Sequence, residues 1–168
     1  MTDWQYYPRT RPLPQHLLDI VGVFEAATAD IGSTAWKLSS NQVLAKVAGG
    51  LAAHGYRVET GSTRDKKVRV PVLFGRNGRT EKAFEVDAYS ESQLTVIEVE
   101  AGRGVTNNQF LKDLFEACVM PSVDYLVLAV RSTYRTSKDF GTVCSFLDSL
   151  YASDRLVLPL DGVLVVGY

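Results

Sequence analysis

Three acidic residues on two neighbouring segments have the types and spacing needed to bind a cation. Asp87 lies near the end of segment 82–89, and Glu98 and Glu100 lie in segment 94–100. Both segments alternate apolar and polar residues, as half-buried strands do. The linker 90–93 is short enough for a hairpin, so we expect Asp87 and Glu98 to be diagonal neighbours on one face, about 7–8 Å apart at Cα. Carboxylates gathered in this way repel one another unless a cation lies between them, and Mg²⁺ or Mn²⁺ prefers such oxygen ligands.

A stretch of opposite charge comes just before these carboxylates. Residues 64–82 contain seven bases and two acids, whereas residues 83–100 contain five acids and no base. The bases are Arg64, Lys66, Lys67, Arg69, Arg76, Arg79 and Lys82. A cationic segment beside an anionic cluster suits a metal-dependent enzyme that acts on a phosphate polymer. Two solvated hairpin faces would produce the same pattern, so charge alone leaves both interpretations open.

Composition predicts one α/β domain. The chain has 168 residues, is 46% hydrophobic and 22% charged, and has a net charge of −1. These values suit a single core and exclude a strong overall field that would attract polyanions. We find no signal peptide and no apolar run long enough to span a bilayer, which predicts a cytoplasmic protein with no membrane partner. The two cysteines and two histidines form no zinc pattern.

Periodicity and turn residues indicate the order of the elements. Residues 1–16 read as an extended arm and residues 17–168 as a single domain. Helical faces are expected at 17–31, from Ser39 or Ser40 to Gly55, at 108–118 and at 139–151. Strands are expected at 56–60, 68–74, 83–89, 94–100 and 124–131, the last nearly all apolar and so covered on both faces. Segments 156–159 and 163–166 are predicted to form a C-terminal hairpin.

The spacing of the carboxylates and the order of the elements resemble the PD-(D/E)xK nuclease superfamily. That fold places an Asp and a (D/E)xK tripeptide on adjacent antiparallel strands of an αβββαβ core, and Asp87 with Glu98-Val99-Glu100 is similar to this motif. Val86 replaces the Pro of the motif, and Glu100 replaces its Lys. Glu-x-Glu is most similar to the BamHI- and BglII-like restriction endonucleases. The resemblance implies a restriction endonuclease-like core, with a central mixed sheet flanked by helices.

The resemblance also implies roles for individual residues. Asp87, Glu98 and Glu100 would be catalytic, with Asp87, Glu98 and the Val99 backbone carbonyl as ligands of Mg²⁺ or Mn²⁺. Glu100 would orient or deprotonate the attacking water in place of the Lys. Glu25 in the first helix is a further candidate ligand, although a mid-helix Glu is usually solvated. Glu98 and Glu100 could instead form the wet face of an edge strand, paired with Lys or Arg.

Nucleic acid, with DNA first, is the predicted partner. Its contacts are predicted at Arg64, Lys66, Lys67, Arg69, Arg103, Asn108 and Gln109. Helix capping would explain one Asn equally well, and Arg103 could bind loop carbonyls rather than a phosphate.

Three functions remain open from the sequence. The first is a metal-dependent nuclease that hydrolyses phosphodiester bonds in DNA. The second is a nuclease-like fold without turnover that binds nucleic acid or protein, an alternative that the missing Lys supports. The third is a structural module that assembles through the edge of the hairpin expected at 156–166. A homodimer is left open as an assembly.

Overall fold

The computed structural model describes residues 2–102, 105, 107–133 and 138–168. Its central element is a mixed six-stranded sheet in the order β1-β8-β7-β6-β5-β2. The strands of this sheet are β1 (Asp3–Tyr7), β2 (Arg57–Val58), β5 (Ala88–Ser90), β6 (Thr95–Glu100), β7 (Tyr125–Val130) and β8 (Gly162–Gly167). The parallel strands β6, β7 and β8 occupy the middle, and antiparallel strands lie at both edges. The protein is therefore an α/β fold with a mixed sheet, as the sequence predicts.

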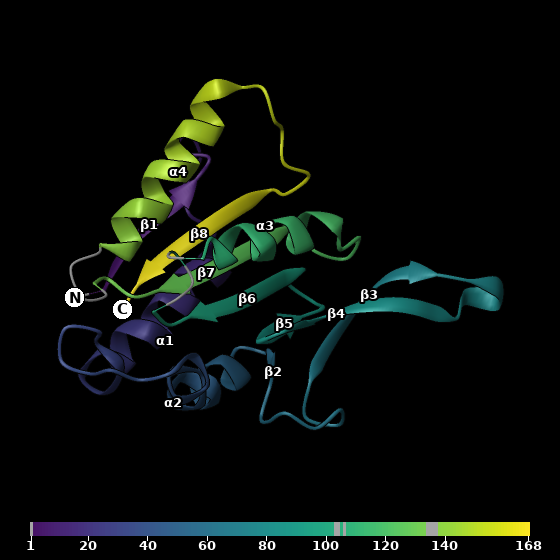
Figure 1. Ribbon diagram of the computed structural model, residues 1–168, viewed down its shortest axis with the longest axis horizontal. Coiled ribbons are helices and arrows are strands. Elements are labelled where there is room, and N and C mark those ends of the chain that lie inside the picture. Colours follow the sequence, from purple (N-terminus) through teal and green to yellow (C-terminus); the bar gives the residue numbers. More distant parts are fainter. Residues whose placement is uncertain (1, 103–104, 106, 134–137) are drawn as a thin grey trace.

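The described helices cover the two faces of this sheet. They are α1 (Gln15–Ile31), α2 (Ser40–Ala53), α3 (Gln109–Val119) and α4 (Asp139–Ser153). Figure 1 shows α1 and α2 on one side and α3 and α4 on the other. Alternate residues of each strand enter different cores: Ile97 and Val99 pack with α1 and α2, whereas Val96 and Leu128 pack with α3 and α4. Strand β7 is buried on both faces, which agrees with its continuous apolar sequence.

Helix α2 begins with the capping pattern expected at this position. Ser39 is the N-cap, and its side chain accepts a hydrogen bond from the Gln42 backbone N–H. The Gln42 side chain in turn accepts a hydrogen bond from the Ser39 backbone N–H. This capping box satisfies two N–H groups that the first turn leaves without helical partners. Among the described residues, no helix combines the length and the apolar composition that crossing a membrane would require.

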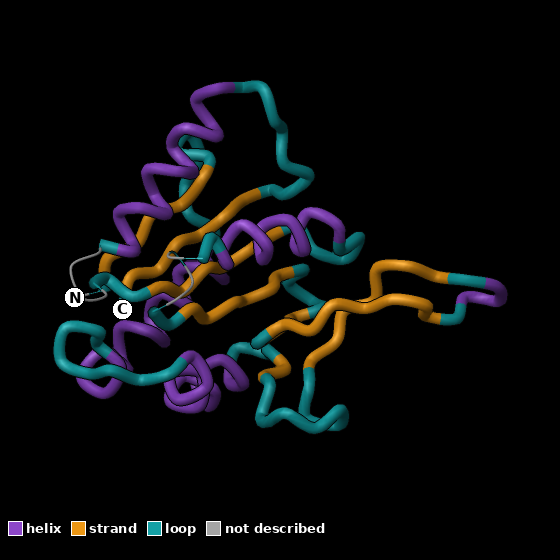
Figure 2. The backbone as a smooth tube through the Cα atoms, viewed as in Figure 1, coloured by secondary structure: helices purple, strands orange, loops and turns teal. Residues whose placement is uncertain are grey.

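A second sheet projects from the body of the molecule. It consists only of β3 (Val68–Phe74) and β4 (Thr80–Val86), joined by the single-turn 3-10 helix η1 (Arg76–Gly78). Figures 1 and 2 show this hairpin standing clear of the helices. Strand β3 matches the strand predicted at 68–74, whereas β4 begins and ends three residues before the strand predicted at 83–89. The three strands predicted between 68 and 100 do not share one sheet, however, because the chain leaves the hairpin after Val86 and enters the main sheet at Ala88.

Both ends of the chain differ from the sequence prediction. The N-terminal segment is extended, but Asp3–Tyr7 pairs antiparallel with β8 as the edge strand β1, and Tyr6 and Tyr7 are buried. The predicted C-terminal hairpin is wrong, because only Gly162–Gly167 forms a strand there and Val157 is 80% exposed. Strand β8 pairs with β1 and β7 on its two sides, so it offers no edge for assembly.

Candidate active site: an acidic cluster beside beta6

Asp87 lies where the chain passes from the hairpin to the main sheet. Ala88 pairs with Ile97, and this register continues to place Asp87 opposite Glu98. The predicted register was two residues different and made the two residues diagonal neighbours; the turn at 91–94, in which Leu94 has a φ of 49°, sets the observed one. Asp87 Oδ2 accepts a hydrogen bond of 2.8 Å from the Val99 N–H. The Asp87 backbone N–H lies near the Glu98 carboxyl and lowers its pKa in part.

Strand β6 carries two of the predicted acids on the face covered by α3. Its apolar residues Ile97 and Val99 are buried on the opposite face, which places Glu98 and Glu100 together. Burial raises the pKa of Glu98 well above its usual value, and the nearby Asp87 carboxylate raises it further. The N–H and C=O of one strand residue point to the same side, so the Val99 carbonyl also faces the side of Asp87.

Helix α3 adds a fourth acid, Asp113, to the cluster. Asp113 is only 5% exposed because it shares the buried face of α3 with Phe110 and Leu114. The carboxyls of Asp113 and Glu100 lie close enough to share a proton. No N–H or hydroxyl group among the described residues donates to Asp113 Oδ2. Burial and then the charge of Asp113 raise the pKa of Glu100 to about 8. Burial also raises the pKa of Asp113 itself.

Two lysines and a fifth acid surround the cluster. The Glu59 backbone N–H donates a 2.8 Å hydrogen bond to the Asp87 carbonyl, and Lys67 Nζ lies 2.9 Å from a carboxylate oxygen of Glu59. Lys112 Nζ lies 3.3 Å from Glu116 one turn along α3. Lys67 lowers the pKa of Asp87 and Lys112 lowers that of Glu100, but burial is the larger effect. Burial raises the pKa of Asp87 to about 6.

The chemistry of these side chains fits a hard divalent cation. The group offers carboxylate oxygens from Asp87, Glu98, Glu100 and Asp113 and a backbone carbonyl from Val99, which are the ligands that Mg²⁺ and Mn²⁺ prefer. The unpartnered Asp113 Oδ2 is one buried acceptor without a donor in the described part of the chain. Within the same described residues, no three His, Cys, Asp or Glu side chains already have the arrangement of a metal-binding group. Asp87 and Glu100 instead use their oxygens in the hydrogen bonds to Val99 and Asp113.

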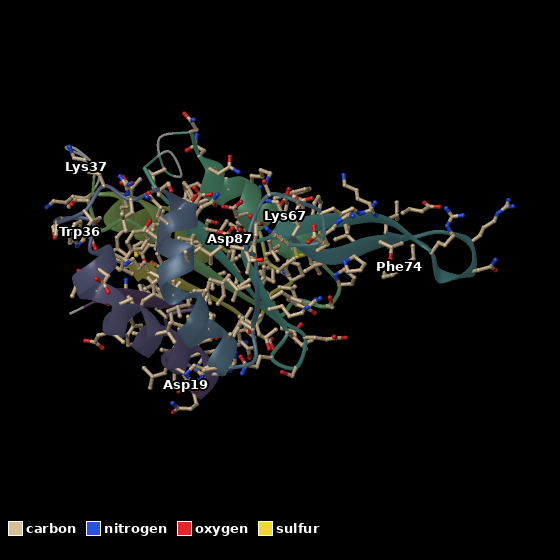
Figure 3. The ribbon with its side chains drawn as sticks, turned by 90° about the horizontal axis from the view of Figure 1, so that it is seen from below. Asp19, Trp36, Lys37, Lys67, Phe74 and Asp87 are labelled. Atoms are coloured by element: carbon tan, nitrogen blue, oxygen red, sulfur yellow. The ribbon has the colours of Figure 1, made fainter. Side chains whose placement is uncertain are left out.

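Other predicted residues lie at varied distances from this cluster. Glu25 is exposed on α1, whose buried side chains pack against the opposite face of the sheet, so the fold does not bring it to Asp87. Lys67 lies at the root of the hairpin close to Asp87 (Figure 3). Arg64 and Lys66 are exposed in the loop before β3, and Arg69 is exposed on β3 itself.

The predicted contacts near the start of α3 are only partly described. Asn108 is the exposed N-cap of α3, but its side chain makes no capping hydrogen bond and its φ is 53°. The alternative that the Asn108 side chain caps the helix is therefore wrong. Gln109 is half-buried and lies close enough to Asp113 to lower the pKa of that carboxyl, which places it beside the acidic cluster. Arg103 lies outside the described residues.

Sequence reasoning missed three members of the cluster: Glu59, Lys112 and Asp113. Asp113 carried a signal, because it lies three residues after Phe110 and one before Leu114, on the apolar stripe of an amphipathic helix. A charged residue on such a stripe is seldom buried without a partner. Glu59 and Lys112 carried no comparable signal. Their positions depend on how α3 and the segment after β2 pack around β6.

Comparison of the chain with models of known protein families, with curated proteins and with solved structures found no match. The chemistry of the site is therefore the basis for a functional proposal.

Proposed function

We propose that this protein is a metal-dependent nuclease that hydrolyses phosphodiester bonds in DNA. The observation that carries the proposal is the gathering of Asp87, Glu98, Glu100 and Asp113 beside one strand, with the pKa of each carboxyl raised. Buried acids that repel one another cost stability, and perturbed pKa values cluster at functional sites. A role in catalysis explains why such an arrangement is present.

The proposed fold is a restriction endonuclease-like core. The αβββαβ order that the sequence resemblance implies is matched by α1, β3, β4, β6, α3 and β7 in chain order. Helix α2 and strand β2 are inserted before β3, and strand β5 is inserted before β6. The proposal is supported by the antiparallel pairing of β5 with β6, whose register continues to Asp87 opposite Glu98, an arrangement similar to that of the PD-(D/E)xK motif. The separation of β3 and β4 into their own sheet is the main departure from that core.

Each residue of the cluster has a proposed role. Asp87, Glu98 and the Val99 carbonyl would hold a Mg²⁺ or Mn²⁺ ion, which neutralises charge on the phosphate and acidifies water when bound. Glu100 would accept a proton from the water that attacks the phosphorus atom. Its pKa of about 8 lies near neutral pH, which suits a group that must both take up and release a proton. Asp113 would hold Glu100 in place through their hydrogen bond.

The test is cleavage of DNA by the full chain and by variants that change one carboxylate to an amide. We expect the wild type to cut supercoiled plasmid or labelled oligonucleotides in Mg²⁺ or Mn²⁺, and Glu98→Gln to lose at least about 100-fold in rate. Glu25→Gln is the matched control, because it makes the same chemical change at an exposed position on α1. Calorimetry with Mn²⁺ alone should show millimolar or tighter binding that Glu98→Gln weakens.

Two results would overturn the proposal. The first is a wild type that leaves plasmid, linear and single-stranded DNA uncut in both metals. The second is cleavage that persists in Glu98→Gln, which would place the chemistry elsewhere. Equal losses in Glu98→Gln and Glu25→Gln would also count against the proposal, because the loss would then not be specific to the acidic cluster.

A nuclease-like binding module is the second candidate function. The specific observation in its favour is that Glu100 stands where the related motif has Lys and is engaged by Asp113. A protein of this kind would bind DNA with a strong salt dependence and leave it intact in Mg²⁺ and Mn²⁺. The cleavage experiment therefore separates the two functions.

A further inference from the structure

The outer half of the β3–β4 hairpin exposes large apolar side chains to solvent. The inner half packs into the core under α3 and α4 through Val68, Val70 and Val86. Farther out, Leu73 is 53% exposed and Phe74 is 54% exposed. A two-stranded ribbon is marginally stable by itself in water, and large apolar side chains at its end add to that cost. This end of the hairpin is therefore suited to contact another molecule.

The same end of the hairpin is cationic. Arg76 and Arg79 lie at the turn, Lys82 follows on β4, and all three side chains are exposed. Among the described residues, none of these three forms an ion pair with a carboxylate. Lys82 Nζ lies 5.2 Å from the centre of the Phe84 ring, which leaves its charge available. The partner that complements this surface is anionic.

Both strands of the hairpin begin or end beside the acidic cluster. Asp87 follows the last residue of β4, and Lys67 precedes the first residue of β3. Figure 3 shows Lys67 and Asp87 at the root of the hairpin and Phe74 far out along it. A polyanion with one phosphate at the acidic cluster can therefore contact the tip of the hairpin with another part of its chain.

The shape of the hairpin distinguishes between nucleic acids. The major groove of duplex DNA is about 12 Å wide and accepts a two-stranded ribbon. Arginine and lysine contact phosphates or guanine edges there, and apolar side chains contact thymine methyl groups. Single strands are bound instead on rows of aromatic side chains, and Phe74 is the only aromatic residue beyond Phe84 on this hairpin. The features together favour a duplex.

We infer that the β3–β4 hairpin binds in the major groove of duplex DNA and thereby holds the sugar–phosphate backbone of the duplex at the acidic cluster. This inference rests on the proposed function and specifies its substrate as a duplex. At the tip of the hairpin, Arg76 and Arg79 contact the duplex. Leu73 and Phe74 become covered by the walls of the groove.

Binding can be measured apart from cleavage. A fluorescent duplex of about two helical turns and its labelled strand alone are titrated with full-length protein in Ca²⁺, and anisotropy is recorded over a salt series. Arg76→Gln with Arg79→Gln is the test variant. Lys37→Gln with Lys46→Gln is the control, because it removes the same charge from exposed positions away from the hairpin, with Lys37 at the far end of the molecule from Phe74 in Figure 3.

We expect the test variant to weaken duplex binding at least tenfold and to lower the slope of log K against log salt by about 2. The control should change duplex binding by less than about threefold, and single-strand binding should change little in either variant. Leu73→Ser with Phe74→Ser should also weaken duplex binding while leaving the circular dichroism spectrum unchanged. Duplex affinity that is equal in wild type and test variant overturns the inference, and so does an equal loss on duplex and single strand.

The two proposals fail in different ways. If the wild type cleaves DNA and the hairpin variants bind and cleave a duplex equally well, the inference is wrong and the nuclease function stands. If the wild type binds a duplex through the hairpin but never cleaves it, the inference about the hairpin stands and the proposed nuclease function is wrong.

Discussion

Glu100 and Asp113 share a buried hydrogen bond although both are acids, and this requires a proton between them. Asp87, just before β5, lies opposite Glu98 on β6, and its carboxylate accepts a hydrogen bond from the Val99 N–H. Four carboxyl groups therefore have higher pKa values in the folded chain than in the unfolded one. The native state binds more protons than the unfolded state at pH values between the two sets of pKa values.

The stability of the metal-free protein should depend on pH in a defined direction. The pKa rises on folding from 3.8 to about 6 for Asp87 and from 4.5 to about 8 for Glu100. The free energy of unfolding should therefore be largest at and below the unfolded pKa values, and it should fall by several kcal/mol as pH rises from about 5 through about 6 to about 8. Urea unfolding in the presence of a chelator, followed by circular dichroism, measures this change.

Asp113→Asn provides the internal check on this pH dependence. Removal of the Asp113 charge lowers the pKa of Glu100, so the variant should lose less stability between about pH 5 and about pH 8. Glu25→Gln should keep the wild-type slope, because Glu25 is exposed on α1. A wild type whose stability is constant or rises over this range would contradict the assignment of buried, mutually repelling acids.

At the scale of elements, β1 is the part of the fold that differs most from its sequence pattern. The segment contains Trp4, Tyr6 and Tyr7 and is followed by prolines, which predicted an extended arm. In the structure it completes the sheet beside β8. The Tyr7 hydroxyl donates to the Cys144 carbonyl of α4 at 2.9 Å, and its ring stacks on Tyr151 with the centroids 5.5 Å apart.

Substitution of Tyr7 should therefore be costly. Tyr7→Ala should lower the free energy of unfolding by about 3–5 kcal/mol, because it leaves a cavity under α4 and removes the hydrogen bond from the Tyr7 hydroxyl to the Cys144 carbonyl. Trp4→Ala, in the same strand, is the control and should cost less than about 1 kcal/mol, because Trp4 is 42% exposed. Urea denaturation compares the two. Equal costs would mean that β1 does not contribute to the core.

The whole molecule presents a second exposed surface, between α3, α4 and residues 156–159. It lines a hollow of about 280 Å³ and consists almost wholly of apolar side chains. Phe115 is 64% exposed, and Phe146, Leu156 and Val157 are also exposed. These side chains form one contiguous apolar patch, and the largest apolar patch on a protein surface often marks an interaction site. A stable interface buries about 800 Å² on each partner, of which this surface could form the apolar centre.

A homodimer through this surface is therefore expected. Sedimentation velocity over a range of concentrations should give a dimer for the wild type and a monomer for Phe115→Ser with Val157→Ser. Leu18→Ser is the control, because Leu18 is 43% exposed on α1 and lies outside the surface. A wild type that remains monomeric at high concentration would contradict this prediction, and a dimer that survives the double change would place the interface elsewhere.

The sequence by itself determined the features that depend on neighbouring residues. Alternation in β6 placed Glu98 and Glu100 on one face, and the apolar run of β7 predicted a strand buried on both sides. The pair Ser39 and Ser40 predicted the start of α2. Each of these follows from local periodicity or capping, which packing elsewhere did not override.

Only the tertiary structure decided which segments meet. It added Asp113 to the acids of β6, placed β1 beside β8, and separated β3 and β4 from the main sheet at Asp87. It also placed Glu25 outside the cluster by assigning α1 to the opposite face. The physical reason is that strand partners and helix positions minimise exposed apolar surface and unpaired backbone groups over the whole chain. The periodicity of one segment contains no information about its distant partners.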